Sequence, residues 1–420
     1  MKVLVIGNGA REHAITWKLA QSHWQPRLYC APGNAGTSLL AQNIPLAAHD
    51  VAGLLAFARA EAIDLTVVGP EAPLVAGLAD RFREAGLAVF GPSMAAATLE
   101  GSKVWSKRLM QRWGIPTASA EVFDSMASAA AHLETIAYPA VIKADGLAAG
   151  KGVTVVSDRA EALQAVEDMM ERRVFGSAGE RVIVEECLYG REVSLLAFTD
   201  GETVVPMVAA CDYKRVNDGD QGPNTGGMGS YSPPSFFSSA LQREVTQSIL
   251  EATVKAMAAE GCPYQGVLYA GLMLTDQGPK VLEFNARFGD PETQVVLPRL
   301  KSDLLDIMLA TVSGRLGSEP VAWDDSACCG VVLASGGYPG HYETGKLIDG
   351  LEEVPPEVEV FHAGTMRRDG RVVTNGGRVL TVVAKGKDMR EAREKVYAGL
   401  APIRFEGMHY RRDIALREVV

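Results

Sequence analysis

The chain has 420 residues, of which 47% are hydrophobic and 22% are charged, as expected for a globular protein of two or three domains. Its formal net charge of −10 disfavours non-specific binding to nucleic acid, which needs a basic face. The sequence has neither an apolar run long enough to span a membrane nor a signal peptide. The six cysteines form no C-x-x-C pair, so the composition predicts a cytoplasmic protein with reduced thiols.

The first hundred residues alternate short apolar runs with segments of helical periodicity. Strands are expected at 2–6, 27–30, 65–68 and 88–90, and helices at 10–20, 50–62 and 75–84. This β-α-β alternation predicts a parallel, doubly wound sheet. Each predicted strand ends at glycine or proline, and open sheets of this kind bind ligands at the carboxyl ends of their strands.

The remainder of the chain has an α+β pattern. The middle predicts an antiparallel pair at 140–143 and 153–156, a helix at 159–173, and strands at 181–185 and 192–199. Short strands dominate from residue 326 onward, with a hairpin at Asp369-Gly370 and an amphipathic helix at 388–400. Domain boundaries are therefore expected near 101–107 and 315–325.

The motif G-N-G-A-R-E-H-A at residues 7–14 follows a predicted strand and opens a helix, where backbone N–H groups can bind a phosphate. It lacks the third glycine of a dinucleotide-binding fingerprint, and no acidic residue ends the next strand, at residues 29–32. The motif therefore favours a phosphate or sugar phosphate over NAD. A plain tight turn between strand and helix is the alternative.

The motif V-I-K-A-D-G-L-A-A-G-K-G-V places Lys143 at a strand end and Lys151 in a loop with Gly146, Gly150 and Gly152. A mobile glycine loop with two lysines can fold over a triphosphate. The spacing is not that of a Walker A loop, because no Ser or Thr follows the lysine. The alternative is a solvated hairpin tip.

The segment E-E-C-L-Y-G-R-E carries Glu185 and Glu186 at the end of one predicted strand and Glu192 at the start of the next. A linker whose backbone can face a base, with a carboxylate nearby for ribose hydroxyls, suits a nucleoside pocket. Acidic residues on the rim of a sheet are the alternative.

The motif V-L-E-F-N-A-R-F-G-D-P-E-T-Q places Glu283, Asn285 and Arg287 on one face of an expected strand. A carboxylate and an amide oxygen suit Mg²⁺, and an arginine can neutralise phosphate or carboxylate. Asp290 and Glu292 follow at a turn. The pattern predicts a metal and phosphate site, with a surface charge cluster as the alternative.

Residues 212–229 form a polar, glycine-rich segment that we expect to be a long substrate loop, with a disordered loop as the alternative. Its fixed charges are Asp212, Lys214 and Arg215. The seven histidines show no metal-ligand spacing, and there is no nucleophile elbow, so zinc, iron and hydrolase chemistry are disfavoured.

The run R-F-G-D-P-E-T-Q at residues 287–294 resembles the signature of the glycinamide ribonucleotide synthetases (phosphoribosylamine–glycine ligases) of the ATP-grasp superfamily. The resemblance covers the whole chain in order, at residues 7–14, 32–36, 68–74, 143–152, 212–229 and 374–380. It implies an α/β and α+β multidomain fold. This comprises a Rossmann-like domain over 1–104, an ATP-grasp domain over 105–320 with a mobile nucleotide-clamp subdomain at about 118–190, and a small β-rich domain over 321–420.

The resemblance also implies a reaction of de novo purine biosynthesis. ATP, glycine and 5-phosphoribosylamine would give glycinamide ribonucleotide, ADP and phosphate through glycyl phosphate, with Mg²⁺ or Mn²⁺ bound by Glu283 and Asn285. The implied ATP contacts are Lys103, Lys143, Gly146, Gly150, Lys151, Gly152, Glu185, Glu186, Leu188 and Glu192. The implied substrate contacts are Gly9, Arg11, Asn34, Glu71, Asn224, Gly227 and Met228. The implied catalytic residues are Arg287, Asp290, Asp212 and Lys214.

The expected partners are these small molecules, without nucleic acid or membrane, in a monomer or weak homodimer. The sequence departs from the family pattern at Cys187, where an aromatic residue is frequent. The strand at 267–275 also carries no acidic residue, so a second protein carboxylate on the metals is not expected. The alternatives are another ATP-grasp ligase or carboxylase (for example an aminoimidazole ribonucleotide carboxylating enzyme or a biotin carboxylase), an NAD-dependent oxidoreductase, and a non-catalytic nucleotide-binding module.

Overall fold

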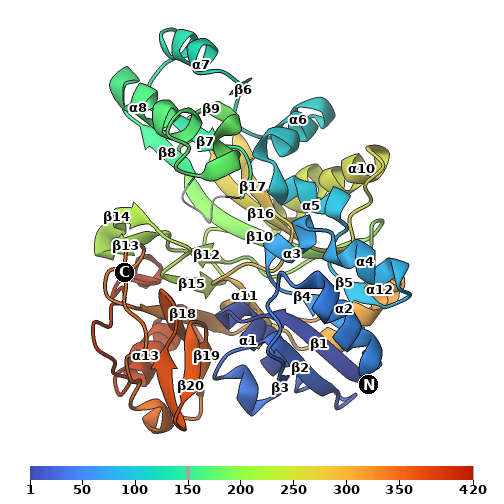
Figure 1. Cartoon of the computed structure of the whole chain (residues 1–420). Coiled ribbons are helices and arrows are strands. Elements are labelled where there is room, and N and C mark those ends of the chain that lie inside the picture. Colours follow the sequence, from blue (N-terminus) through green and yellow to red (C-terminus); the bar gives the residue numbers. More distant parts are fainter. Residues whose placement is uncertain (148–151, 420) are drawn as a thin grey trace.

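The N-terminal segment forms the predicted parallel sheet in a computed structural model that describes residues 1–147 and 152–419 (Figure 1). The strand order is β3-β2-β1-β4-β5, and every pair in it is parallel. The strands are β1 (Lys2–Gly7), β2 (Arg27–Pro32), β3 (Gln42–Asn43), β4 (Leu65–Val68) and β5 (Val89–Phe90). The helices are α1 (Ala10–Leu19), α2 (Val51–Ala60), α3 (Glu71–Val75) and α4 (Leu78–Glu84).

The prediction of a single helix at 75–84 is wrong, because the chain forms the two short helices α3 and α4 there. Gly77 separates α3 from α4 with φ of +81°, a left-handed conformation that glycine adopts without strain. Strand β3 was not predicted from the sequence, because it is only two residues long. Helices α5 (Met94–Gly101) and α6 (Lys103–Trp113) then lead away from this sheet.

Residues 120–186 form an antiparallel sheet that stands at the top of Figure 1. Its order is β6-β9-β7-β8, with β6 (Ala120–Phe123), β7 (Ala140–Ala144), β8 (Val153–Val156) and β9 (Val182–Glu186). Helices α7 (Met126–Leu133) and α8 (Arg159–Met170) pack on it around a separate hydrophobic cluster. The predicted antiparallel pair β7–β8 is confirmed.

A second antiparallel sheet lies below this one, with the order β11-β10-β16-β17. Its strands are β10 (Arg191–Thr199), β11 (Val204–Pro206), β16 (Gly266–Thr275) and β17 (Gly278–Asn285). The associated helices are α9 (Ser239–Val245), a π-helical turn at Thr246–Glu251, α10 (Ala252–Ala259), α11 (Thr293–Val296) and α12 (Leu304–Val312). We call this the central sheet.

The C-terminal segment builds a sheet with the order β12-β15-β18-β22-β19. Strands β18 (Ala327–Ala334), β19 (Val358–His362) and β22 (Arg378–Gly386) come from the C-terminal segment, but β12 (Cys211–Asp212) and β15 (Gly229–Ser232) come from the segment expected to be a loop. That expectation is wrong, because β13 (Arg215–Asn217) and β14 (Gln221–Asn224) also pair there as a hairpin. The predicted hairpin at Asp369-Gly370 joins β20 (Thr365–Arg368) to β21 (Arg371–Thr374), and α13 (Met389–Leu400) follows.

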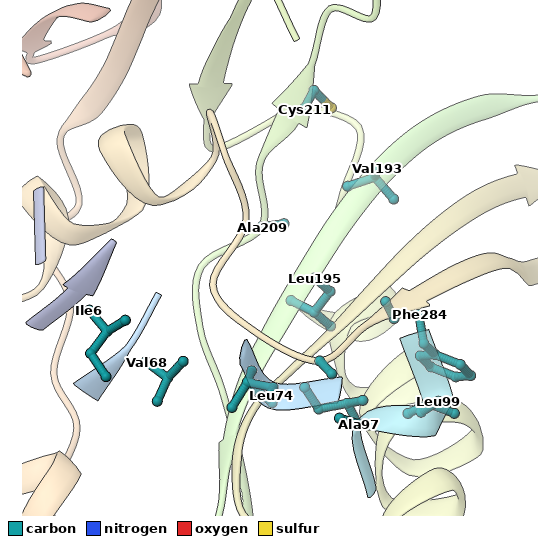
Figure 2. Close-up of a cluster of buried hydrophobic side chains, with 14 of the residues drawn as sticks. Ile6, Val68, Leu74, Ala97, Leu99, Val193, Leu195, Ala209, Cys211 and Phe284 are labelled. Carbon is teal, nitrogen blue, oxygen red and sulfur yellow. The ribbon is translucent and has the colours of Figure 1, made fainter. Parts of the chain in front are cut away.

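One hydrophobic cluster joins the N-terminal and central sheets (Figure 2). Ile6 and Val68 reach it from β1 and β4, Leu74 from α3, and Leu195 and Phe284 from β10 and β17. All five side chains are at most 3% exposed, and burial of apolar area of this kind is the main favourable term in folding. The cluster brings the end of β17 close to the carboxyl ends of the N-terminal strands.

All six cysteines are free thiols, as predicted. Across residues 1–147 and 152–419, no helix combines the length and the apolar character that crossing a membrane would require.

Candidate active site

The turn that follows β17 gathers charged side chains from distant parts of the chain. Arg287 Nε donates to Glu71 Oε2 at 3.1 Å, and Arg287 Nη2 lies 2.9 Å from Glu100 Oε1. Burial favours the neutral guanidine, but Glu100 and Glu71 outweigh it and raise the pKa of Arg287. Arg287 is thus held as a fixed cation at the boundary between two sheets.

Arg287 does not lie on the strand that the sequence predicts for it, because β17 ends at Asn285. It stays beside the strand end nonetheless, since its Nη2 donates to Asn285 Oδ1 at 3.2 Å. Glu283 and Asn285 therefore lie on β17 as expected, whereas Arg287 lies in the turn that follows the strand. A bulge near Leu282 also interrupts the pairing of β17 with β16.

Two N-terminal residues named by the sequence reach this turn. Arg11 Nη1 donates to the carbonyl of Phe288 at 3.2 Å. Burial raises the pKa of Glu71, but Arg287 and Arg11 outweigh it and the net pKa is lowered. Gly9 caps α1 just before Arg11. The first β-α turn therefore belongs to the same cluster as the R-F-G-D-P-E run.

Asn34 serves mainly as a structural bridge. Its Nδ2 donates to the carbonyls of Asn8 at 2.9 Å and His362 at 2.7 Å, and its Oδ1 accepts from the amides of Gly36 and Thr37. The side chain thereby ties the N-terminal sheet to β19. A substrate contact by this amide would have to share these partners.

Asp290 lies at the far end of the turn and pairs with a C-terminal arginine. Arg378 Nη2 is 3.0 Å from Asp290 Oδ2, and Gln294 Nε2 donates to Oδ1 at 2.8 Å. Burial raises the pKa of Asp290, but Arg378 and then Arg11 lower it below its ordinary value. Arg378 Nη1 also donates to the carbonyl of Gly226, so the segment after β14 joins the site.

The substrate residues expected at the end of β14 and after it differ in how accessible they are. Asn224 ends that strand and is partly exposed, and Gly227 packs against Pro291. Met228, in contrast, is fully buried, its amide donates to Tyr213 and its carbonyl accepts from Val332. The structure therefore argues against a direct substrate contact by Met228, because its side chain and both backbone groups are already used.

Three lysines face Glu283 from different elements. Lys103 begins α6, Lys143 lies on β7 and Lys214 follows β12. Burial raises the pKa of Glu283, but these lysines, with Lys214 the strongest, bring it below its ordinary value. The carboxylate is therefore charged and lies among cationic side chains. It could serve as an oxygen ligand for a metal ion or as a partner for phosphate-binding lysines.

Glu185 was expected to contact the nucleotide, but its side chain is buried between two lysines. Its carboxylate is 4% exposed and lies 2.8 Å from Lys143 Nζ and 3.0 Å from Lys107 Nζ. The side chain therefore fixes Lys143 and does not line an open nucleoside pocket. Its neighbour Glu186 is exposed and accepts from the amide of Ser119 at 2.9 Å, and Leu188 is half-buried in the linker to β10.

The glycine loop is described only at its ends. Lys103 Nζ donates to the carbonyl of Gly146 at 2.8 Å, and the carbonyl of Gly152 accepts from the amide of Ala144. Gly150 and Lys151 lie outside the described residues. The loop thus leaves and rejoins the sheet next to Lys143.

Around Asp212, acidic groups crowd beside one lysine. Lys214 Nζ lies 2.6 Å from Glu192 Oε2. Burial raises the pKa of Asp212 to about 7, with Lys214 opposing the rise and Glu292 adding to it. Glu292 is itself buried and accepts from Tyr269 Oη at 2.9 Å. Asp212 can therefore exchange a proton near neutral pH.

Several charged residues that lie among these side chains were not predicted as site residues from the sequence. They are Glu12, Glu100, Lys107 and Arg378, whereas Glu292 was noted at the turn of its motif but given no role. Glu12 and Arg378 stand inside the motifs at 7–14 and 374–380, where they could have been found. Glu100 and Lys107 lie on α5 and α6 outside any motif, so only the fold reveals them.

Comparison with known proteins gives the family. Residues 1–100, 101–293 and 328–417 match the models of the N domain, the ATP-grasp (A) domain and the C domain of phosphoribosylglycinamide synthetase. The chain belongs to this family. A curated relative from Halalkalibacterium halodurans, named phosphoribosylamine–glycine ligase, is 53% identical over 100% of this chain and 97% of its own. The implied family and the ATP-grasp fold are confirmed, and the chain is an ATP-dependent ligase of purine biosynthesis.

Solved structures agree with this family. The crystal structure of a phosphoribosylamine–glycine ligase from Thermotoga maritima superposes with a TM-score of 0.85 at 36% identity, over 99% of this chain and 100% of that one. A biotin carboxylase domain from Hydrogenobacter thermophilus superposes with a TM-score of 0.74 at 16% identity, over 97% of this chain and 91% of that one. The second likeness shows the fold alone. Membership of the family decides against the carboxylase, oxidoreductase and non-catalytic alternatives.

Proposed function

We propose that the chain joins glycine to 5-phosphoribosylamine, forming glycinamide ribonucleotide, ADP and phosphate through a glycyl phosphate intermediate. The observation that carries this proposal is that two groups of charged side chains, each made of cations and a carboxylate, meet at the end of β17. The lysines around Glu283 lie on one side, and Arg287, Arg11 and Asp290 lie on the other. The first group suits a nucleotide, and the second suits the two smaller substrates.

ATP would lie between the β6–β9 sheet and the central sheet. Lys103 and Lys143 would bind its phosphates, and the glycine motif with Gly146, Gly150, Lys151 and Gly152 would provide further phosphate contacts. The linker from Glu186 to Leu188 would take the adenine, and Glu192 the ribose. Because Glu185 is buried between two lysines, we assign it the positioning of Lys143 and not a contact with the base.

Ligases of the ATP-grasp fold use ATP with divalent metal ions, and the donor set here fits Mg²⁺ or Mn²⁺. Glu283 is kept ionised by its lysine neighbours, and Asn285 Oδ1 has a lone pair beyond the one that faces Arg287. Two oxygen donors of this kind are what such ions accept from proteins when phosphates supply further ligands. A bound ion would neutralise charge on the transferred phosphate.

In this reaction the protein mainly positions the substrates and neutralises the negative charge of the transferred phosphoryl group. The glycine carboxylate attacks the γ-phosphorus of ATP while Lys143 and Arg287 stabilise the negative charge. The amine of phosphoribosylamine then attacks the glycyl carbonyl and releases phosphate, while Arg11, Glu71 and the Asn224–Gly227 segment hold this substrate. Gly9 was expected to contact it as well, but its amide already donates to Glu12, so we assign it to the positioning of the turn. Asp212, with its pKa near 7, can take the proton that this amine loses, and Lys214 would orient the carboxylates beside it. Asp290 would orient Arg378.

We further propose the domain division at 1–104, 105–320 and 321–420, with the clamp subdomain at about 118–190. The ranges of the family models at 1–100, 101–293 and 328–417 support it. β12 and β15, which complete the C-terminal sheet, come from the middle segment, so the second and third domains are interleaved. A cytoplasmic location and a monomer or weak homodimer complete the proposal.

The acyl phosphate can be tested by following oxygen. Glycine labelled with ¹⁸O in its carboxylate is turned over with ATP and phosphoribosylamine, and the released phosphate is analysed by mass. The proposal predicts one labelled oxygen in each phosphate, because the carboxylate oxygen that attacks ATP leaves with the phosphoryl group. Unlabelled phosphate from a reaction that forms product would contradict it.

A further inference from the structure

Glu12 is a buried carboxylate at the start of α1 to which neither the sequence motifs nor the proposed mechanism gives a role. It is 2% exposed. Its Oε2 accepts from the amide of Gly9 at 2.6 Å, and its Oε1 accepts from Arg11 Nε at 2.5 Å. Both oxygens thus hold groups of the turn that we assign to the sugar-phosphate substrate.

The space for this side chain is made by three glycines. A Cβ added at Gly7 would lie 2.5 Å from Glu12 Cγ, and one added at Gly9 would lie 2.8 Å from Oε2. A Cβ at Gly69 would come closer still, to Oε1. Gly7 and Gly69 follow Ile6 and Val68, which are paired residues of the neighbouring strands β1 and β4 (Figure 1). Glu12 therefore occupies the floor of the crevice where open α/β sheets bind ligands.

This position changes how the first turn can bind its ligand. The sequence suggests that the N–H groups at the start of α1 receive a phosphate, but the amide of Gly9 is already occupied by a carboxylate. A phosphate placed on that amide would meet the charge of Glu12 at close range. Arg11, the cation next to it, is a side chain of this turn that can bind an anionic substrate.

Two nitrogen atoms of the Arg11 guanidinium donate hydrogen bonds within the part of the chain that the structure describes, and the third does not. Nε is fixed by Glu12 and Nη1 by the carbonyl of Phe288. Within residues 1–147 and 152–419, no acceptor contacts its Nη2. An arginine presents its donors in a rigid planar fork, so fixing one edge determines the direction of the other. The positive charge of Arg11 also lowers the pKa of Glu71 and of Asp290.

We propose that Glu12 is a positioning residue for the sugar-phosphate amine, and that it acts through Arg11. It aims the free edge of the Arg11 guanidinium at the phosphate or hydroxyl oxygens of this substrate and keeps the substrate off the N-terminus of α1. This inference rests on the proposed function, which assigns Arg11 to phosphoribosylamine. It concerns one substrate only, since the ATP-binding lysines lie on other elements.

The experiment measures the KM of each substrate for the wild type, Glu12→Ala, Glu12→Gln, Arg11→Ala and the Glu12→Ala/Arg11→Ala double variant. Gln21→Ala, at an exposed position just after α1, is the control. We expect Glu12→Ala to raise the KM for freshly generated phosphoribosylamine at least about tenfold, the size of one charge-assisted hydrogen bond. The KM for ATP should stay within about twofold. Glu12→Gln, which keeps one acceptor, should lie in between.

The double variant tests the route through Arg11. If Glu12 acts only by aiming this arginine, Glu12→Ala should add little to Arg11→Ala, because the two single effects are then not additive. Additive effects, an unchanged KM for phosphoribosylamine in Glu12→Ala, or an equal rise for all three substrates together with a lower unfolding temperature would overturn the proposal. An inactive wild type would instead refute the proposed function on which it rests.

Discussion

Glu185 and Lys143 form a buried ion pair, with 2.8 Å between Oε2 and Nζ. The same carboxylate lies 3.0 Å from Lys107, and Lys143 also donates to the carbonyl of Leu282 at 3.0 Å. A lysine on β7 is thereby fixed against the central sheet. We infer that Lys143 is set in place before any nucleotide arrives, so that binding need not order a long side chain.

Removing Glu185 should therefore harm both stability and nucleotide binding. Glu185→Ala leaves two buried lysines without their carboxylate, which typically costs about 3–5 kcal/mol. We expect a lower unfolding temperature and a higher KM for ATP, measured by calorimetry and by steady-state kinetics. Glu185→Gln, which keeps the shape and one acceptor, should recover part of both. An unchanged KM for ATP in a folded Glu185→Ala variant would show that ATP binding does not depend on the positioning of Lys143 by Glu185.

Glu283 should matter for turnover far more than for folding. We expect Glu283→Ala to lower kcat by at least about a hundredfold, as loss of electrostatic stabilisation in a phosphoryl-transfer site does. Its unfolding temperature should fall less than that of Glu185→Ala, because Glu283 is half-buried and, within the described residues, its carboxylate has no direct ion pair or hydrogen bond to lose. Gln277→Ala, on the exposed turn of the same β16–β17 hairpin, is the control. Near-normal turnover at saturating Mg²⁺ would remove Glu283 from the metal site.

Arg378 should link the C-terminal sheet to catalysis. Its guanidinium binds the carboxylate of Asp290 and the carbonyls of Gly226 and Asp290. Arg378→Lys keeps the charge but not the planar fork. We therefore expect a loss of about tenfold or more in kcat/KM for both Arg378→Ala and Arg378→Lys, measured with each substrate varied in turn. A lysine variant with full activity would show that only the positive charge is needed.

Asp212 should set a pH dependence. Burial raises its pKa from an ordinary 3.8 to about 7, so the base form that accepts a proton appears only as the pH rises through about 7. We predict a kcat that climbs over that range, and a flat, low profile for Asp212→Asn. A wild-type profile that is level between pH 6 and 8, about one pH unit either side of that pKa, would rule out this role.

The same shift has a consequence for stability. Because the folded chain holds this proton more tightly than the unfolded one, the wild type should lose stability relative to Asp212→Asn as the pH rises from 3.8 to about 7. Thermal unfolding of both variants across this range measures the difference. A difference that is constant or of opposite sign would show that the carboxyl is not kept protonated.

Local sequence patterns predict local structure well here. The parallel sheet follows from strands that end in glycine or proline, and the β20–β21 hairpin follows from Asp369 and Gly370, which both have positive φ. The break between α3 and α4 depends on a single glycine within an otherwise helical pattern. The hairpin β13–β14 is hidden in a polar, glycine-rich segment that has no alternation of apolar residues.

The site is harder to predict because its contacts are long-range. Arg287 and Glu71 are 216 residues apart in the chain, and Asp290 and Arg378 are 88 apart. Motifs can mark the residue types that a nucleotide or a metal ion needs, and Lys143, Glu283 and Arg287 were predicted on that basis. Motifs cannot show that Glu185 contacts two lysines, since that depends on the pairing of β9 with β7 and on the packing of α6 against β9.

The central claim is most directly tested by ADP release from the full chain with Mg-ATP, freshly generated phosphoribosylamine and either glycine or another small amino or carboxylic acid. The account predicts ADP release that needs both glycine and phosphoribosylamine, with a product of the mass of glycinamide ribonucleotide. ADP release that depends on bicarbonate or another acid, or no release from folded protein that binds ATP, would contradict it.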